Sequence, residues 1–213
     1  PEDHAVLEKK GFLLVDSGAT YMDGTTDITR TYPLGPLTED EKRFYTWTLQ
    51  SHIDLAKAVW LDYCECKMID TIAREPLWRH LINYRCGTGH SVSFVGNVHE
   101  GPHALNSRNT TRMRPGMVVT DEPGVYETDL VGIRIENELV CVHKADNQYG
   151  TFLGFEPLMF VPIATSPILP GVLDKDEIAW LNDYHRQVFA KLAPHLNDEE
   201  RSWLAEKCAA IGC

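Results

Sequence analysis

The sequence lacks the features that would mark it as a membrane, secreted or nucleic-acid-binding protein. It has no apolar run long enough to cross a bilayer and no segment typical of a secretory signal peptide. Basic residues are scarce, since 20 Lys and Arg stand against 31 Asp and Glu and give a net charge of −11. This charge opposes binding to a phosphate backbone or to an anionic membrane, so we expect no nucleic-acid partner and no membrane partner.

Cysteine is also used without a pattern. The six cysteines are scattered without the spacing of a disulfide framework, which favours reduced thiols and a cytoplasmic location. The Cys64-x-Cys66 pair is only a weak metal-binding signal. The chain begins at Pro1 rather than at methionine, almost directly before a strand, so we expect it to be a piece of a longer protein. An apolar fraction of 43% over 213 residues predicts a substantial core.

The stretch that organises the chain is 13–30, which reads LLVDSGATYMDGTTDITR. It predicts a buried strand, a turn signalled by Asp23-Gly24, and a returning β-branched strand. A loop centred on 21–22 would place Asp16 and Asp27 almost opposite each other, whereas a two-residue turn at Asp23-Gly24 would offset them by about four residues. In both registers the two carboxylates repel each other unless a cation or a strong donor lies between them.

Capping boxes and apolar periodicity predict four helices. The first begins at a capping box formed by Thr38 and Glu41 and extends toward Trp60. The second spans 66–78 and is interrupted near Pro76. Two more begin at capping pairs near the carboxy terminus, Asp174 with Glu177 and Asn197 with Glu200.

The stretch 85–103 combines glycine with histidine. Gly87 and Gly89 allow a sharp bend or a close backbone approach, and the stretch lacks the lysine and the spacing of a phosphate-binding loop. A single histidine is more often structural than functional, but three within fourteen residues favour a site. These three are His90, His99 and His103.

Further acids lie on strands in the second half of the chain. A short buried strand over 117–120 delivers Glu122 before a Pro-Gly turn. An alternating strand is predicted over 131–143, with one apolar face and a second face that carries Arg134, Glu136 and Glu138. Taken singly, these acids fit a face wetted by solvent.

As a set, the acids are harder to explain as solvated surface. The set comprises four carboxylates and one imidazole on strands or strand ends: Asp16, Asp27, His90, Glu122 and Glu136. Four negative charges match two divalent cations, and oxygen ligands with one nitrogen suit Mn²⁺, Zn²⁺, Co²⁺ or Fe²⁺. Two such ions roughly 3.5–4 Å apart can share a water and lower its pKa. The sequence therefore predicts a dinuclear metal site.

The order of these residues resembles a known family. The pattern D-x10-D, GTGH, HEGP, DEP, RIE is similar to the M24 metallopeptidases, which include methionine aminopeptidase, prolidase and aminopeptidase P. VDSGATYMDGTTDITRT, GNVHEGP, MVVTDEPGVY, GIRIENE and the tail FLGFEPLMFVPI resemble the aminopeptidase P (Xaa-Pro aminopeptidase) branch. The resemblance implies an α+β pita-bread (creatinase/aminopeptidase-like) fold, a curved antiparallel sheet backed by helices and incomplete at the amino terminus. It implies a catalytic portion over 1–144 and a two-helix extension over 145–213.

The resemblance also implies roles for individual residues. The implied ligands of two divalent ions, with Mn²⁺ the first choice and Zn²⁺ or Co²⁺ the alternatives, are Asp16, Asp27, His90, Glu122 and Glu136. Asp27 and Glu136 would bridge the ions. Glu122 would also handle the proton of the attacking water, His99 would contact the substrate or the tetrahedral intermediate, and Arg134 would support the bridging carboxylates.

The chain departs from the family pattern in two respects. Cys86 stands where a histidine four positions before His90 is usual, and Ser-Val-Ser follows His90 where glycines are usual. A further active-site histidine of the family falls upstream of Pro1, because His4 is too close to Asp16 to take its place. These differences bear on substrate affinity or rate rather than on metal binding.

The implied activity is hydrolysis of the bond between an amino-terminal residue and a following proline in a peptide substrate. The resemblance also implies a homodimer and an amino-terminal domain that is missing from this chain. Two alternatives stay open: a prolidase of the same fold, restricted to dipeptides, and a catalytically silent peptide-binding module. Silent relatives usually lose ligands, whereas all five ligand types are present here.

Overall fold

The largest sheet is built from strands that pair antiparallel in the order β3–β10–β9–β6. The computed structural model describes residues 6–212, so the predictions made on Pro1, His4 and Cys213 lie outside the described residues. The strands of this sheet are β3 (Val59–Leu61), β6 (Val118–Asp121), β9 (Asn137–Asn147) and β10 (Gly150–Pro157). The other strands pair two by two: β1 (Phe12–Tyr21) with β2 (Gly24–Pro33), β4 (Gly89–His90) with β5 (Ala104–Leu105), and β7 (Gly124–Glu127) with β8 (Val131–Arg134).

The helices begin where their capping residues predict. They are α1 (Glu39–Ala56), α2 (Cys66–Trp78), α3 (Lys175–Leu192), a 3₁₀ turn (Ala193–His195) and α4 (Asp198–Lys207). The capping boxes of Thr38, Asp174 and Asn197 are all formed. Within the described part of the chain, none of the helices is both long and apolar enough to span a membrane.

Helix α2 continues through Pro76, where an interruption was predicted. The proline costs the helix one backbone hydrogen bond. The apolar side chains of Ile69, Ala73 and Leu77 are fully buried, and this packing outweighs the cost.

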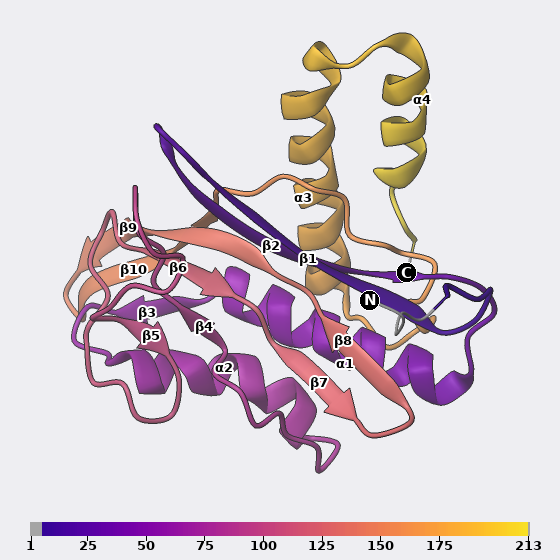
Figure 1. The fold of residues 1–213 in the computed structure, drawn as a ribbon. Coiled ribbons are helices and arrows are strands. Elements are labelled where there is room, and N and C mark those ends of the chain that lie inside the picture. The colour runs from indigo at the N-terminus through magenta and orange to yellow at the C-terminus, as the bar shows by residue number, and fades with distance from the viewer. Residues whose placement is uncertain (1–5, 213) are drawn as a thin grey trace.

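The elements form layers around the sheet (Figure 1). Helices α1 and α2 pack on one face, whereas the long β1–β2 hairpin arches across the opposite face, and α3 and α4 stand to one side. Leu139 and Cys141 of β9 lie with α2 residues in one apolar core. A second core joins α1 to α3 and β8 through Leu49, Ile53, Ile133, Leu181 and Val188.

The hairpin takes neither of the two predicted registers. Tyr21 pairs with Gly24, so the two-residue turn is Met22-Asp23. Gly24 is the first residue of β2 and has a φ of 149°, a backbone conformation that glycine adopts readily. The glycine is therefore needed just after the turn rather than within it. Asp27 consequently lies opposite Gly18, two residues along the ladder from Asp16.

The entering strand of the hairpin is not buried as predicted. Its residues are partly or fully exposed, and Val15 retains 40% exposure. Within residues 6–212, β1 pairs with β2 alone and its second edge has no strand partner. An apolar run therefore indicated a strand correctly but not its burial.

Two further boundaries differ from prediction. The region before Trp60 is not helical, because α1 ends at Ala56 and the buried Trp60 pairs with Leu153 in the sheet. The strand predicted over 131–143 is divided after Arg134 into β8 and β9, and β9 continues beyond the predicted end to Asn147. In both places the pairing of strands in the sheet decides the secondary structure against the local sequence pattern.

Candidate metal centre

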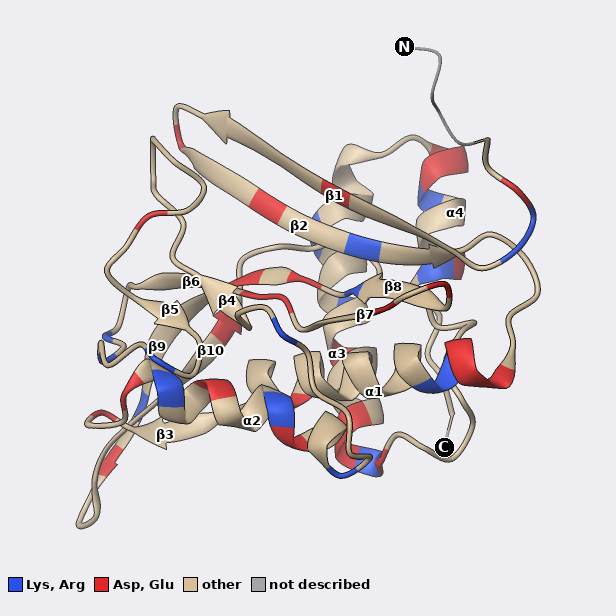
Figure 2. Ribbon diagram, turned by 60° about the horizontal axis from the view of Figure 1, so that its bottom comes forward, with Lys and Arg blue, Asp and Glu red and all other residues tan. Residues whose placement is uncertain are grey.

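One face of the sheet collects the acids that the sequence singled out. Thr120 of β6 pairs with Glu138 of β9, Glu122 follows Thr120 by two residues, and Glu136 precedes Glu138 by two residues. Because side chains alternate along a strand, these four point toward the hairpin while Leu139 points into the helix-side core. The hairpin adds its own acids above this face, and Figure 2 shows acidic segments on both β1 and β2.

The structure brings all five predicted ligands together. Their ligand atoms fall into three overlapping groups within which all atoms lie within 4.8 Å of one another. The groups are Asp27, His90 and His99; His90, Glu122 and Glu136; and Asp16, Asp27 and Glu136. Asp27, His90 and Glu136 each belong to two of these groups, so they connect the three groups into one cluster.

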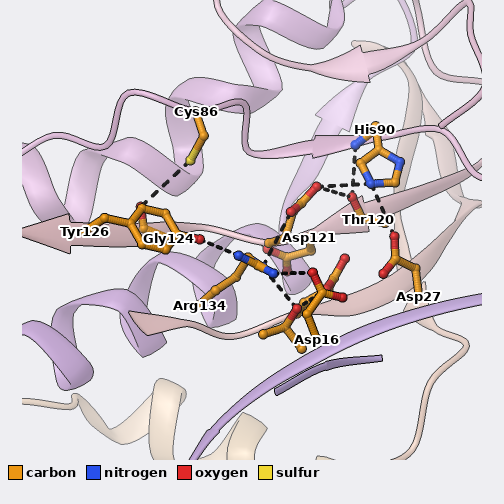
Figure 3. A network of polar contacts seen from close by, with 12 residues as sticks. Asp16, Asp27, Cys86, His90, Thr120, Asp121, Gly124, Tyr126 and Arg134 are labelled. Carbon is orange, nitrogen blue, oxygen red and sulfur yellow. Dashed lines mark hydrogen bonds and ion pairs between the residues drawn. The ribbon is translucent and has the colours of Figure 1, made fainter. Parts of the chain in front are cut away.

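His90 is oriented for ligation. Its Nδ1 lies 3.2 Å from the Ser91 carbonyl oxygen, to which it can donate only as Nδ1–H. Its Nε2 then faces carboxylate oxygens of Asp27 and Glu122, each at 3.3 Å (Figure 3). This is the tautomer that offers Nε2 to a metal, because the hydrogen bond at one ring nitrogen fixes the proton away from the other.

The backbone before His90 lies directly on strand β6. A Cβ atom on Gly89 would lie 1.8 Å from the carbonyl oxygen of Thr120, so this position requires glycine. The predicted close approach is therefore found at Gly89, whereas a Cβ on Gly87 would meet only ordinary contacts. The His90 N–H donates to Thr120 Oγ1 at 2.9 Å, and that hydroxyl donates to Glu122 at 3.0 Å.

Arg134 connects the carboxylates (Figure 3). Its guanidinium donates to Asp16 and to the Tyr126 hydroxyl, and its Nε donates to Thr29 Oγ1 at 3.0 Å. Thr29 in turn donates to Glu136 Oε2 at 2.5 Å. A relay through Thr29 was not predicted, although the alternation of β2 places this residue on the same face as Asp27.

The acidic face is buried rather than wetted by solvent, so the alternative of a solvated polar side on the 131–143 strand does not hold. Glu136 is 1% exposed and Glu138 is 5% exposed. Burial, with the nearby carboxylates of Glu122 and Asp27, raises the pKa of Glu136 to about 8. Burial also raises the pKa of Glu122, against the opposing effects of His90 and Arg134.

These properties fit two divalent cations. The donor set is rich in carboxylate oxygen with one imidazole nitrogen, and Glu136 Oε1 is buried without a hydrogen-bond partner among the described residues. Negative charge gathered out of water needs compensation. Burial opposes the charged form of His90, but Asp27 and Glu122 outweigh it and raise the pKa of this imidazole.

The remaining candidates take different positions. The His99 ring packs on the His90 ring with centroids 3.7 Å apart. His103 stays outside the three ligand groups and contacts the Val118 carbonyl through Nε2 at 2.7 Å. Cys86 donates to the Gly124 carbonyl at 3.8 Å (Figure 3). Around the Cys64-x-Cys66 pair, the described residues form no metal-ligand group, and Cys66 belongs to the apolar core.

A buried network on α2 supports the glycine-rich loop and was missed by the sequence analysis. Thr88, two residues before His90, donates to Asp70, which also accepts from Arg74 Nε at 2.7 Å. Arg74 donates to the carbonyls of Tyr84 and Cys86 at 2.8 and 2.9 Å. The i,i+4 spacing of the Asp70–Arg74 pair was the available signal.

Arg30 ties the carboxy-terminal segment to the same face. It is 3% exposed and donates to the Glu136 carbonyl, to Asn137 Oδ1 at 2.8 Å and to the Val161 carbonyl at 2.7 Å. It also donates to the Tyr184 hydroxyl of α3 at 2.9 Å. The guanidinium therefore joins a residue of the candidate site to a helix near the end of the chain.

The fold and this arrangement of acids agree with one family. The model of metallopeptidase family M24 matches residues 1–143, and the model of the C-terminal region of peptidase M24 matches residues 151–211. The chain belongs to metallopeptidase family M24, with its pita-bread fold.

Several curated relatives of this chain are aminopeptidases P. It is 41% identical over 219 residues to the probable Xaa-Pro aminopeptidase P of Coprinopsis cinerea, covering 99% of this chain and 35% of the relative. It is 43% identical over 211 residues to aminopeptidase P2 of Arabidopsis thaliana, covering 96% of this chain and 30% of the relative. The chain thus spans about a third of the length of these relatives.

Solved structures give the same picture. The X-prolyl aminopeptidase of Caenorhabditis elegans, described as a cytosolic enzyme with a dinuclear active site, matches with a TM-score of 0.88 and 40% identity. That match covers 93% of this chain and 33% of the other. The prolidase of Pyrococcus furiosus matches less well, with a TM-score of 0.59 and 29% identity over 70% of this chain and 41% of the other.

Proposed function

We propose that this chain carries the metal centre of an aminopeptidase that removes an amino-terminal residue preceding proline. The observation that carries the proposal is the convergence of Asp16, Asp27, His90, Glu122 and Glu136 in three overlapping groups of ligand atoms. Similarity to aminopeptidase P relatives over nearly the whole chain supports the choice of substrate. We assign these five residues as ligands of two divalent ions, with Asp27 and Glu136 bridging.

The chemistry divides between the ions and the protein. When bound, the two cations would lower the pKa of a water between them and polarise the scissile carbonyl. Glu122 accepts the proton of the attacking water and delivers it to the leaving imide nitrogen. This delivery matters because the nitrogen of a bond to proline is tertiary and must be protonated to leave.

His99 and Arg134 act on different partners. The His99 imidazole, packed on His90, donates a hydrogen bond to the oxygen on which negative charge develops. Arg134 does not meet the substrate in this proposal. It holds Asp16 directly and Glu136 through Thr29, and its Nε lies 3.8 Å from Glu122 Oε2.

The finer assignments follow from the same reasoning. Mn²⁺ is our first choice of metal because the donor set is rich in oxygen, with Zn²⁺ and Co²⁺ as the alternatives. We also propose a cytoplasmic location, supported by the free thiols of Cys64, Cys66, Cys86, Cys141 and Cys208 and by the cytosolic Caenorhabditis elegans relative. A homodimer, an additional amino-terminal domain and the division of this chain near residue 144 remain proposals from family resemblance.

A prolidase activity is the second candidate, favoured by structural similarity to prolidases. The experiment supplies Mn²⁺ to the full-length protein that contains this chain, because the family pattern places a further active-site histidine upstream of Pro1, and it compares cleavage of Ala-Pro, Ala-Pro-Ala and Ala-Ala-Ala. We expect Ala-Pro-Ala to be cleaved before proline and Ala-Ala-Ala to be spared. Cleavage of Ala-Pro alone would favour prolidase, and no cleavage with two metal equivalents bound would contradict both activities. Replacement of the exposed Glu127 by Gln is the matched control for variants at the site.

A further inference from the structure

A cavity of about 760 Å³ adjoins the candidate metal centre. It lies between the hairpin tip, the segment 91–94 that follows His90, and the segment 116–118 that enters β6. The hairpin and the 91–94 segment touch across it, because Thr25 Oγ1 donates to the Phe94 carbonyl at 3.4 Å. None of the five proposed metal ligands lines this cavity.

Glu138 lies at the end of this cavity nearest the metal centre. It stands two residues after Glu136 on β9, pairs with Thr120, and projects from the same face of the sheet. Val118, two residues before Thr120, also lines the cavity, so the cavity continues the row of acids along the sheet. Glu138 belongs to none of the three groups of metal-ligating atoms.

Two buried polar atoms in the cavity wall have no partner within the described chain. Glu138 is 5% exposed and its Oε1 accepts no hydrogen bond, and His103 is 7% exposed and its Nδ1 is unpaired. Buried polar atoms are nearly always satisfied, so these two atoms require a hydrogen-bond partner from outside the described chain. The lining contains no Lys or Arg from the described residues, and its second carboxylate is that of Asp23 near the mouth.

The remaining walls specify the shape of that ligand. Apolar groups of Met117, Val118, Leu158 and Met159 also line the cavity. A lone ammonium group would leave this volume and these walls unused. A lysine or arginine side chain matches both, because it carries a cationic head on a long aliphatic stem.

We propose that Glu138 is a specificity-determining residue that binds the Lys or Arg side chain of a peptide substrate in this cavity. The inference rests on the proposed function, since it takes the ligand to be the peptide held at the adjoining metal centre. The cationic head donates to Glu138 Oε1, the stem packs on Met117 and Val118, and the pairing fills an otherwise empty acceptor.

The test compares arginine with citrulline, which has nearly the same shape but no charge. Binding of Arg-Pro-Ala, Cit-Pro-Ala, Ala-Pro-Arg and Ala-Pro-Cit to the chain is measured by calorimetry in the absence of metal. Cleavage of the same peptides is measured with Mn²⁺. We expect the arginine peptide of at least one pair to bind roughly 10- to 100-fold more tightly, the range for a hydrogen bond to a charged group.

Glu138→Gln should abolish this preference and leave binding of the citrulline peptides unchanged. Asp23→Asn removes the same charge at the mouth and should retain most of the preference. Equal binding within both pairs, or a preference that survives Glu138→Gln, would overturn the proposal. The comparison on the unaltered chain keeps this decision independent of whether the variant folds. If no peptide is cleaved but arginine is still preferred, the proposed function fails, and what stands is binding of a cationic side chain by Glu138 rather than its role in substrate specificity.

Discussion

Strand β9 separates two environments that differ in how they treat charge. On its helix side, Leu139 and Cys141 are fully buried among apolar side chains. Asn137, also on that side, is satisfied by Arg30 and by His52 of α1. On its hairpin side, acids are buried almost as deeply, and the Oε1 atoms of Glu136 and Glu138 find no hydrogen-bond partner in residues 6–212.

The two sides of β9 affect the stability of the fold in opposite ways. An apolar core is stable by itself, because it removes hydrocarbon surface from water. A buried acidic face is not, because each ionised carboxylate loses hydration and repels its neighbours. The helix side therefore stabilises the folded state, whereas the hairpin side destabilises it unless bound cations compensate the charge of its carboxylates.

The largest effect is expected from the two acids proposed to bridge the ions. Asp27→Ala or Glu136→Ala should each lose both metal equivalents, because each would remove a carboxylate that the proposed site shares between two ions. Elemental analysis of purified protein measures the content, with exposed Glu127→Ala as the control. An Asp27→Ala protein that still binds two equivalents would show that the bridging assignment is wrong.

Glu122→Gln should separate metal binding from turnover. The amide retains an oxygen ligand but cannot accept a proton, so at least one metal should remain while kcat falls about 10²- to 10⁴-fold. Steady-state kinetics with parallel metal analysis would measure both quantities. Near-normal kcat would remove Glu122 from the proposed mechanism.

Leu139→Ala tests the opposite side of the same strand. Deleting a fully buried leucine should cost about 2–5 kcal/mol of unfolding free energy, because it leaves a cavity in the core. Metal content should stay at the level of the unaltered chain. Chemical denaturation gives the stability, and a coupled loss of metal would mean that the two sides are not independent.

The stability of the metal-free protein should depend on pH because Glu136 is buried. Since the pKa of Glu136 rises from 4.5 to about 8 on folding, the folded state binds the proton more tightly than the unfolded state. Stability should therefore fall as pH rises from about 4.5 to 8, by roughly 2–3 kcal/mol between pH 6 and 8. Thermal unfolding with a chelator measures this, and Glu136→Gln should flatten the profile; an unchanged slope in that variant would assign the effect elsewhere.

Cys86 should give the smallest effect. Its thiol makes one long contact to the Gly124 carbonyl, so Cys86→Ala should change kcat/KM by less than about fivefold. Cys86→His should be tolerated or should raise turnover. A hundredfold loss in Cys86→Ala would reveal a role for the thiol that its contacts do not explain.

The sequence predicted those features that short-range chemistry determines. Capping boxes determined where α1, α3 and α4 begin. The close approach of the backbone at Gly89 to Thr120 followed from the absence of a side chain. Ligand types and their order were enough to select residues that do converge, although their roles as ligands remain proposals.

Features that depend on distant partners were not predictable in the same way. The hairpin register depends on the whole β1–β2 ladder, and the burial of Glu136 and Glu138 depends on a hairpin more than a hundred residues away, as the Thr29–Glu136 hydrogen bond shows. Alternation on β9 identified a polar face correctly. It could not distinguish a polar face in water from one beneath another layer of protein.

The position of Arg30 has a consequence for how this protein can be divided and recombined. Its guanidinium donates both to the backbone of Glu136 and to the hydroxyl of Tyr184, so α3 shares a buried hydrogen-bonding hub with the acidic face. The carboxy-terminal segment is consequently a poor candidate for a detachable module. Chimaeras between M24 relatives that exchange this segment will need to exchange the residues around Arg30 with it, whereas surface loops away from this hub can be exchanged without them.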